Sequence, residues 1–250
     1  MKEREVAVRA AKKAGKVLIE NYGKVGFRRD IKDVFSEIDK KSERVIIKEI
    51  SKKFPDHTII SEESDLEKKN SEYEWYIDPV DGTTSYVNRI PSFSISIGLV
   101  KKGEPILGVI YNPLYLELFV AEKDKGAYIN GKKLKVDDTK ELSESFLATD
   151  LGHENKKKVI PYFTKTVPNV SYIYIFGSAC IGLSYLADAR IQGYFHNDLK
   201  PWDIAAGVLL VEEAGGRVTD LKGNKWNINK PDILATNGFI HEKLLNMLYQ

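Results

Sequence analysis

Apolar residues at the start of the chain recur at the spacing of one helix face, three or four residues apart. The residues of this face are Val6, Ala10, Ala14, Val17, Leu18 and Tyr22. Gly23 follows where a C-terminal cap is expected. A second run of this kind predicts a helix from about Ser36 to Phe54, because Pro55 cannot continue it. The first part of the chain is therefore expected to form two amphipathic helices.

Short β-rich stretches follow these helices and are separated by turn residues such as Lys102-Gly103-Glu104 and Asn130-Gly131. This spacing predicts a meandering antiparallel sheet. Its strands are expected at residues 57–61, 74–78, 93–100, 106–111 and 116–121.

Beyond about residue 140 the pattern changes to strands that alternate with helices. Strands are expected at 146–149, 172–176, 193–196, 217–220 and 233–236, and helices at 155–165, 178–187, 204–214 and 239–249. No linker or repeat separates the two textures. The chain is therefore expected to form one compact unit of helix and sheet layers, with an α+β half at 1–140 and an α/β half at 141–250.

Composition then narrows the classes of function. The 250 residues carry 38 Lys and Arg against 36 Asp and Glu, and a net charge of +2 gives no reason to expect nucleic-acid or membrane binding. The sequence has one cysteine, Cys180, which excludes an intramolecular disulfide and a Cys-rich zinc site and is expected to be a packed small residue. No apolar signal core and no membrane span are found, which predicts a cytoplasmic protein.

The most informative segment joins an apolar strand to two carboxylates. Asp78 ends the strand, and Asp81 follows three residues later, after Pro79. Pro79 fixes its own backbone and favours an extended Asp78, so a rigid turn aims both carboxylates at one point. A cation between them would relieve their repulsion, and hard oxygen ligands favour Mg²⁺, Mn²⁺ or Ca²⁺. Gly82 and Thr83 then suit the first turn of a helix, where exposed amides favour a phosphate.

Two further segments place carboxylates at the end of an element. Glu62 and Glu63 follow a short apolar strand, and Asp203 lies in the first turn of an almost wholly apolar helix that is expected to be buried. Each pattern also has an ordinary structural explanation. The segment from Asp78 could be a surface turn, Glu62 and Glu63 could lie in an exposed loop, and Asp203 could be a helix N-cap. Together the three segments present carboxylates as an open metal site requires.

Two of these segments resemble the signature motifs of the inositol monophosphatase family. They are Asp78-Pro79-Val80-Asp81-Gly82-Thr83 and Trp202-Asp203-Ile204-Ala205-Ala206-Gly207, the second running on to Ala214-Gly215-Gly216. The match extends in order from Asp33 to Gly216. This family belongs to the lithium-sensitive, metal-dependent phosphatases, which include fructose-1,6-bisphosphatases. The resemblance implies a layered α-β-α-β-α sugar-phosphatase fold, with mixed sheets and helices between and outside them, and a homodimer.

The resemblance also implies roles for particular residues. Two or three Mg²⁺ ions, for which Mn²⁺ is a substitute, would be held by Glu62, Asp78, the Val80 carbonyl, Asp81 and Asp203. The attacking water would be oriented and activated by Asp33, Thr83 and Glu62. The phosphate would be held by Gly82 and Thr83, and the rest of the substrate would contact Asp81, Gly177, Ser178, Ala179 and His196. The implied reaction is hydrolysis of a small phosphate ester by metal-activated water, with no phosphoenzyme intermediate.

Two features bear on the substrate. His196 stands seven residues before Asp203, where inositol-selective members carry a glutamate that contacts the ring, so strict inositol selectivity is not expected. A neutral core histidine is the alternative reading of this residue. Arg28, Arg29 and Lys32 follow the first helix and suit either a second phosphate group or a solvated loop. The compact chain resembles the archaeal dual-specificity type, which acts on inositol-1-phosphate and fructose-1,6-bisphosphate.

Three other functions stay open on the sequence. A relative that removes the 3′-phosphate of 3′-phosphoadenosine 5′-phosphate would share the mechanism. A non-catalytic binding protein would keep the fold, although the intact carboxylates speak against it. A metal-dependent nuclease would share the carboxylate chemistry but would need a basic groove, which the net charge of +2 does not suggest.

Overall fold

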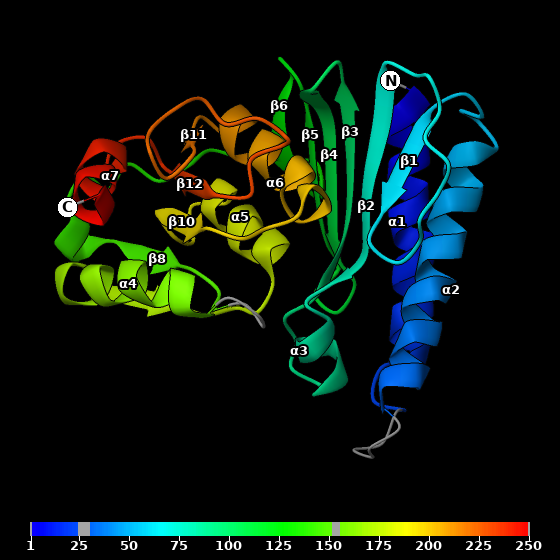
Figure 1. Cartoon of the computed structure of the whole chain (residues 1–250), viewed down its shortest axis with the longest axis horizontal. Coiled ribbons are helices and arrows are strands. Elements are labelled where there is room, and N and C mark those ends of the chain that lie inside the picture. The colour runs from blue at the N-terminus through cyan, green and yellow to red at the C-terminus, as the bar shows by residue number, and fades with distance from the viewer. Residues whose placement is uncertain (1, 25–30, 152–155, 250) are drawn as a thin grey trace.

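The computed structural model of the chain describes residues 2–24, 31–151 and 156–249, and for residues 31–36 it describes the backbone alone. Helices and sheets alternate in five layers across the molecule (Figure 1). Helices α1 (Lys2–Asn21) and α2 (Ile31–Ser51) form one outer layer and cover a seven-stranded sheet. The predicted layered fold with mixed sheets is confirmed. Helix α2 begins five residues before the predicted Ser36, because its apolar spacing continues back to Ile31.

The seven-stranded sheet has its strands side by side in chain order. They are β1 (Thr58–Ser61), β2 (Tyr73–Asp81), β3 (Ser94–Lys101), β4 (Glu104–Asn112), β5 (Glu117–Glu122), β6 (Gly126–Ile129) and β7 (Lys132–Lys133). Strands β2 to β7 pair antiparallel, as the predicted meander requires. The prediction is wrong for β1, which pairs parallel to β2, because residues 62–72 cross back along the sheet instead of forming a hairpin. The sequence patterns did not reveal β6 and β7.

A second sheet has five strands in the order β11-β12-β10-β8-β9. Its strands are β8 (Phe146–Ala148), β9 (Tyr172–Tyr174), β10 (Gly193–His196), β11 (Arg217–Thr219) and β12 (Ile233–Thr236). Each lies within a range predicted from the sequence. Strand β8 pairs parallel with β9 and β10, whereas β12 pairs antiparallel with β10 and β11.

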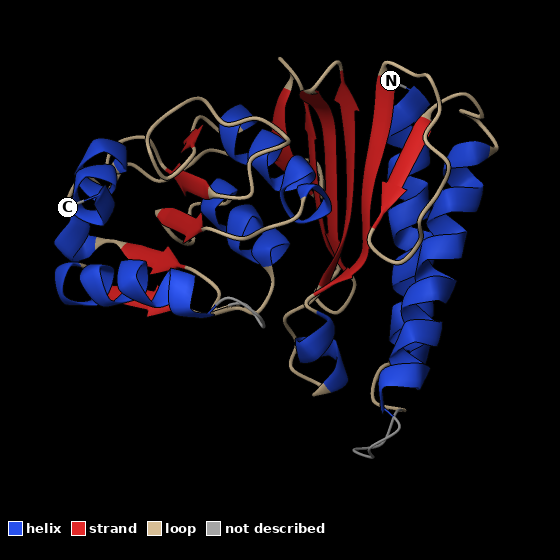
Figure 2. Cartoon of the chain, in the orientation of Figure 1, coloured by secondary structure: helices blue, strands red, loops and turns tan. Residues whose placement is uncertain are grey.

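The remaining helices fill the space between the sheets and cover the outer face of the second one (Figure 2). Helices α5 (Ala179–Ala187) and α6 (Pro201–Glu213) lie between the sheets, and α4 (Lys156–Thr166) and α7 (His241–Tyr249) form the other outer layer. A short helix, α3 (Thr83–Val87), follows β2. Helix α6 begins three residues before the predicted position, since Pro201 suits the first helical turn. None of the helices in the described part of the chain has both the length and the apolar character needed to span a bilayer.

The apolar residues gather in the spaces between these layers. In β3 the side chains of Ile95, Ile97 and Leu99 pack with the α1 and α2 face, while Val100 belongs to the core around α5 and α6. This alternation is the period of two that a strand imposes. A third, smaller core lies between the five-stranded sheet and helix α7. Every sheet face is therefore covered by helices.

Helix α6 packs unusually close to the seven-stranded sheet. Gly98 of β3 and Gly108 of β4 are paired neighbours in the sheet, and α6 lies directly on them. A Cβ at Gly108 would lie 2.5 Å from the carbonyl oxygen of Ala206, and one at Gly98 would lie 2.8 Å from the Ala205 Cβ. The two glycines therefore allow α6 to rest on the sheet, which places Asp203 beside the end of β2.

Candidate active site

The predicted site residues meet in one cavity of about 510 Å³. Strand β1 delivers Glu62 just past its end, β2 delivers Asp78 to Asp81, and the first turn of α6 delivers Asp203. The predicted residues that line the cavity are Glu62, Asp78, Val80, Asp81, Gly82, Thr83, Gly177, Ser178, Ala179, His196 and Asp203. Elements from both sheets and from the helix layer between them therefore converge at one place.

The end of β2 is shaped by a bulge that sets the two central aspartates. Asp78 is paired with Ser96 of β3 and Asp81 with Ser94, so β2 advances three residues while β3 advances two. Asp78 Oδ1 accepts a hydrogen bond from the Val80 amide at 2.9 Å. The rigid turn expected from Pro79 is thus an extra residue inserted in an antiparallel ladder.

Protein donors also fix the carboxylates of Asp81 and Asp203. Asp81 Oδ2 accepts hydrogen bonds from the Ser178 hydroxyl, from the Cys180 amide at 2.9 Å and from the Ser94 hydroxyl at 3.2 Å. Asp203 Oδ2 accepts one from the Lys200 amide at 2.8 Å. Because these donors reach only Oδ2 of each side chain, the other oxygen is left for a ligand. Cys180 itself is fully buried, as predicted.

Four carboxylates form the cluster expected to bind metal: Glu62, Asp78, Asp81 and Asp203. Desolvation raises the pKa of each of them. For the buried Asp78 the pKa lies well above its ordinary value, and the negative charge of Glu62 raises it further. The pKa of Asp81 is also raised, although hydrogen bonds to this carboxylate act in the opposite direction. For Asp203 the pKa is raised to about 8. Glu62 has an exposed side chain, yet the protein around it removes enough water to raise its pKa. The cluster therefore holds several negative charges poorly without a nearby positive charge.

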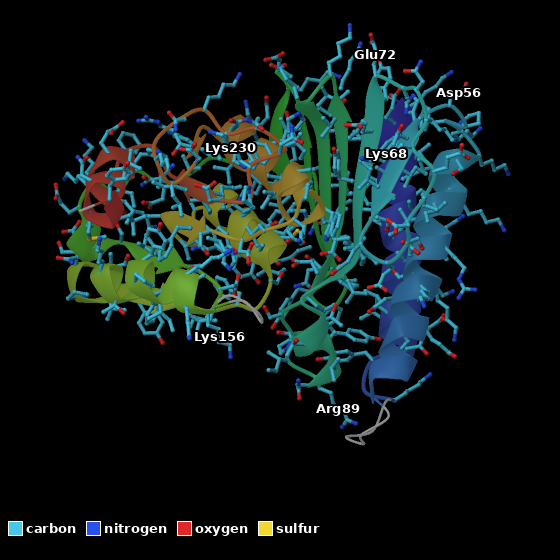
Figure 3. All side chains as sticks on the ribbon, in the orientation of Figure 1. Asp56, Lys68, Glu72, Arg89, Lys156 and Lys230 are labelled. Atoms are coloured by element: carbon cyan, nitrogen blue, oxygen red, sulfur yellow. The ribbon has the colours of Figure 1, made fainter. Side chains whose placement is uncertain are left out.

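The charged residues of the cavity are strongly unbalanced. Six carboxylates line it: Glu62, Asp78, Asp81, Asp150, Asp198 and Asp203. Among the described lining residues one lysine, Lys156 at the start of α4, carries positive charge (Figure 3). Oxygen donors of this kind fit Mg²⁺ or Mn²⁺. No three carboxylate, imidazole or thiol groups in the described part of the chain already have the arrangement of a metal site.

The phosphate-binding residues expected from the sequence lie at the start of α3. Gly82 has a φ of +89°, and a Cβ there would lie 2.6 Å from the Ser92 carbonyl oxygen, so glycine is required. Thr83 donates its hydroxyl proton to the Val80 carbonyl at 2.9 Å. This bond leaves the Thr83 oxygen as an acceptor in the cavity.

The opposite wall is formed by the start of α5 and the end of β10. The Ser178 hydroxyl is held by Asp81 and also caps α5 by accepting from the Ile181 amide at 3.1 Å. His196 is 4% exposed, and its Nδ1 accepts from the Asp198 amide at 3.1 Å. Its Nε2 makes no regular hydrogen bond with the described residues, although the Asp150 carbonyl lies close to the ring. Desolvation lowers the pKa of His196 to about 4, so the ring is neutral at pH 7.

Some predicted residues lie outside the described part of the chain, and several residues that line the cavity, Asp150 among them, were not predicted. Arg28 and Arg29 are among the residues left undescribed, as are the side chains of Asp33 and Lys32. The sequence patterns did not single out Asp150, which accepts hydrogen bonds from the Gly177 amide and the Tyr194 hydroxyl. Its signal was available, because Asp150 follows an apolar strand just as Asp78 does.

Comparison with known proteins agrees with this site. The sequence model of the inositol monophosphatase family matches residues 2–250. The chain belongs to this family. It is 39% identical over 254 residues to the Nus factor SuhB of Pasteurella multocida, covering 97% of this chain and 94% of that protein.

Two other relatives carry enzymatic names. The fructose-1,6-bisphosphatase/inositol-1-monophosphatase of Aquifex aeolicus is 38% identical over 250 residues, with 97% of this chain and 94% of that protein covered. The structure of an inositol monophosphatase from Anabaena (Nostoc) has a TM-score of 0.90 and 38% identity, covering 98% of this chain and 94% of that one. The chain is therefore a phosphoric monoester hydrolase of the inositol monophosphatase family.

Proposed function

We propose that this chain is a Mg²⁺-dependent phosphomonoesterase that hydrolyses inositol-1-phosphate and fructose-1,6-bisphosphate. The observation that carries this proposal is the charge of the cavity, where six carboxylates face one described lysine. A phosphate ester is itself an anion and would be repelled by this wall. Divalent cations reverse that repulsion, and they also favour the ionised form of carboxylates whose pKa is raised.

Two or three Mg²⁺ ions, or Mn²⁺ in their place, are assigned to the donors of this cluster. Glu62, Asp78 and the Val80 carbonyl would hold one ion, and Asp78, Asp81 and Asp203 would hold a second. Support comes from the aspartates, each of which has one oxygen fixed by a backbone amide. When bound, such ions neutralise the phosphate charge and acidify water.

The phosphate and the attacking water are assigned to the start of α3. The amides of Gly82 and Thr83 would hold the phosphate, with Thr83 also orienting the water. Because the Thr83 hydroxyl donates its hydrogen bond to the Val80 carbonyl, its oxygen can accept a hydrogen bond from a water molecule. Asp33 stays the predicted partner of Thr83 in this step.

His196 is proposed to donate a hydrogen bond to a hydroxyl group of the substrate. Since Nδ1 accepts from the Asp198 amide, the neutral ring carries its proton on Nε2. Nε2 is itself buried near the Asp150 carbonyl, so a small rotation of the ring on substrate binding would turn this donor toward a polyol. It would replace the carboxylate that an inositol-selective site would present. Gly177 and Ala179 would line the same region. The Ser178 hydroxyl is committed to Asp81, so we expect it to act by fixing that carboxylate.

Replacing His196 with phenylalanine should weaken the reaction with hydroxyl-bearing substrates only. A planar aromatic ring, somewhat larger than imidazole, is kept and the donor is lost, so kcat/KM for inositol-1-phosphate should fall by about 10-fold, the value of one hydrogen bond. The rate with p-nitrophenyl phosphate, which offers no hydroxyl, should change little. Steady-state kinetics on both substrates measure this difference. Equal losses on the two substrates would remove His196 from substrate recognition.

The substrate assignment is tested with a panel of four phosphate esters in Mg²⁺. It contains inositol-1-phosphate, fructose-1,6-bisphosphate, 3′-phosphoadenosine 5′-phosphate and a short oligonucleotide. We expect phosphate release from the first two. Release chiefly from the nucleotide would keep the chemistry and overturn the substrate, and release from none would favour a binding protein.

A homodimer is proposed through one edge of the five-stranded sheet. Strand β9 forms this edge, and Tyr172 and Tyr174 are 56% and 39% exposed there. Exposed apolar side chains along an unpaired strand favour association with another chain. We expect light scattering to give twice the chain mass, and Tyr172→Glu to give a monomer. A wild-type monomer at micromolar concentration would contradict the proposal.

A further inference from the structure

The bulge at the end of β2 leaves one peptide group without a partner in the sheet. This group joins Pro79 to Val80 and lies between the rungs formed by Asp78 and Asp81. Backbone groups in a bulge are removed from the ladder and need other partners when they are buried. Strand β1 offers none here, because its pairing with β2 ends at Ile77. The partners of this peptide therefore come from elsewhere.

Both ends of the peptide are occupied by side chains. The Pro79 carbonyl accepts a hydrogen bond from the Ser42 hydroxyl at 3.0 Å, and the Val80 amide donates to Asp78 Oδ1 at 2.9 Å. The C=O and N–H of a trans peptide point in opposite directions within one rigid plane. A hydroxyl that fixes the carbonyl therefore also fixes the direction of the amide, and with it the position of the Asp78 carboxylate.

Ser42 is well placed for this task. It lies on α2, which packs against β2, and its side chain is fully buried. Ser42 does not line the cavity, so its side chain is not expected to contact the substrate. The next carbonyl along the bulge, that of Val80, accepts from Thr83 instead. The orientation of the Pro79–Val80 peptide thus depends on a contact from the outer helix layer.

We propose that Ser42 is a positioning residue for the cations, because its hydroxyl sets the peptide that orients Asp78. The inference rests on the proposed function, in which Asp78 is shared by two ions. Loss of the hydroxyl would leave the Pro79 carbonyl unpaired and allow the peptide to tilt. The Asp78 carboxylate would then lose its fixed direction, and metal affinity would fall while the groups that contact the substrate stay in place.

The test compares Ser42→Ala with a matched control, Ser145→Ala. Ser145 is also fully buried and donates its hydroxyl to a backbone carbonyl, that of Glu141 at 2.7 Å, but it lines no part of the cavity. Mn²⁺ binding is measured directly by electron paramagnetic resonance of the free ion, and Mg²⁺ is titrated in a phosphate-release assay. Thermal unfolding without metal reports the structural cost of each variant.

We expect Ser42→Ala to bind Mn²⁺ about 10-fold more weakly and to need about 10-fold more Mg²⁺ for half-maximal rate, as is typical of groups that orient ligands. Its kcat at saturating Mg²⁺ should stay near the wild-type value. Ser145→Ala should lose comparable thermal stability with unchanged metal affinity. A Ser42→Ala chain whose Mn²⁺ affinity equals that of the wild type would overturn the inference. A wild-type chain that binds neither ion would instead overturn the proposed function, and the inference with it.

Discussion

Replacing Asp81 with asparagine is expected to lower kcat by about 1,000-fold or more, since metal ions supply several kcal/mol of stabilisation to such transition states. Asparagine keeps the volume of the side chain and can still accept the hydrogen bonds from Ser178 and the Cys180 amide. The fold should therefore survive. What is lost is the negative charge that the proposed second cation requires. Steady-state kinetics at saturating Mg²⁺, with circular dichroism and thermal unfolding as checks, measure the change.

Asp150→Asn is the matched control for this variant. Asp150 lies in the same cavity, is also buried and accepts a hydrogen bond from a backbone amide, that of Gly177. It has no assigned role as a metal ligand, so its loss of kcat should stay below about 10-fold, the value of a single hydrogen bond. Equal losses in the two variants, or wild-type activity in Asp81→Asn, would defeat the assignment of Asp81.

The stability of the metal-free chain is expected to fall as the pH rises from 6.5 to 8.5. The pKa of Asp203 is raised to about 8 in the folded chain, whereas an unfolded aspartate titrates near 4. Between these values the folded state binds more protons than the unfolded state, so the free energy of unfolding decreases with pH. The pKa values of His196 and His241 are lowered to about 4, and these two residues act in the opposite direction between about pH 4 and 7.5, so they offset part of the fall at the lower end of this window.

Differential scanning fluorimetry in chelator measures this effect. The wild-type melting temperature should fall by roughly 5 °C more than that of Asp203→Asn across the window, because about 2 kcal/mol corresponds to several degrees in a chain of this size. Asp56→Asn, on the exposed surface far from the cluster (Figure 3), should behave like the wild type. Saturating Mg²⁺ should flatten the wild-type curve, since cations favour the ionised carboxylates. An identical fall in wild type and Asp203→Asn would show that Asp203 does not titrate in this range.

Local patterns predicted most of the elements because the decisive signals are local. The helical spacing up to Leu18, the apolar run after Asp203 and the two strands at 193–196 and 233–236 can each be recognised within one segment. The parallel pairing of β1 with β2 could not be predicted in this way. It depends on how residues 62–72 cross the sheet, and no turn signal there distinguishes a crossover from a hairpin.

The candidate site was predictable where its residues end apolar strands or begin a buried helix. Asp78, Asp81 and Asp203 carry that signal, and they meet in the cavity. Ser42 carries none, since a serine on a helix is ordinary and its partner lies 37 residues away in sequence. The hydrogen bond from the Ser178 hydroxyl to Asp81 is equally non-local, because the two residues are 97 positions apart in the sequence. Contacts between distant segments decide such roles, and they emerge only once the layers are assembled.

The central claim is that the carboxylate cavity hydrolyses phosphate esters only when it holds divalent cations. The most direct measurement is phosphate release from inositol-1-phosphate by chain stripped with chelator, followed as Mg²⁺ is added back. The proposed chemistry predicts no release above background in chelator and saturable recovery with Mg²⁺ or Mn²⁺. Release in chelator at the rate seen with Mg²⁺ would contradict it.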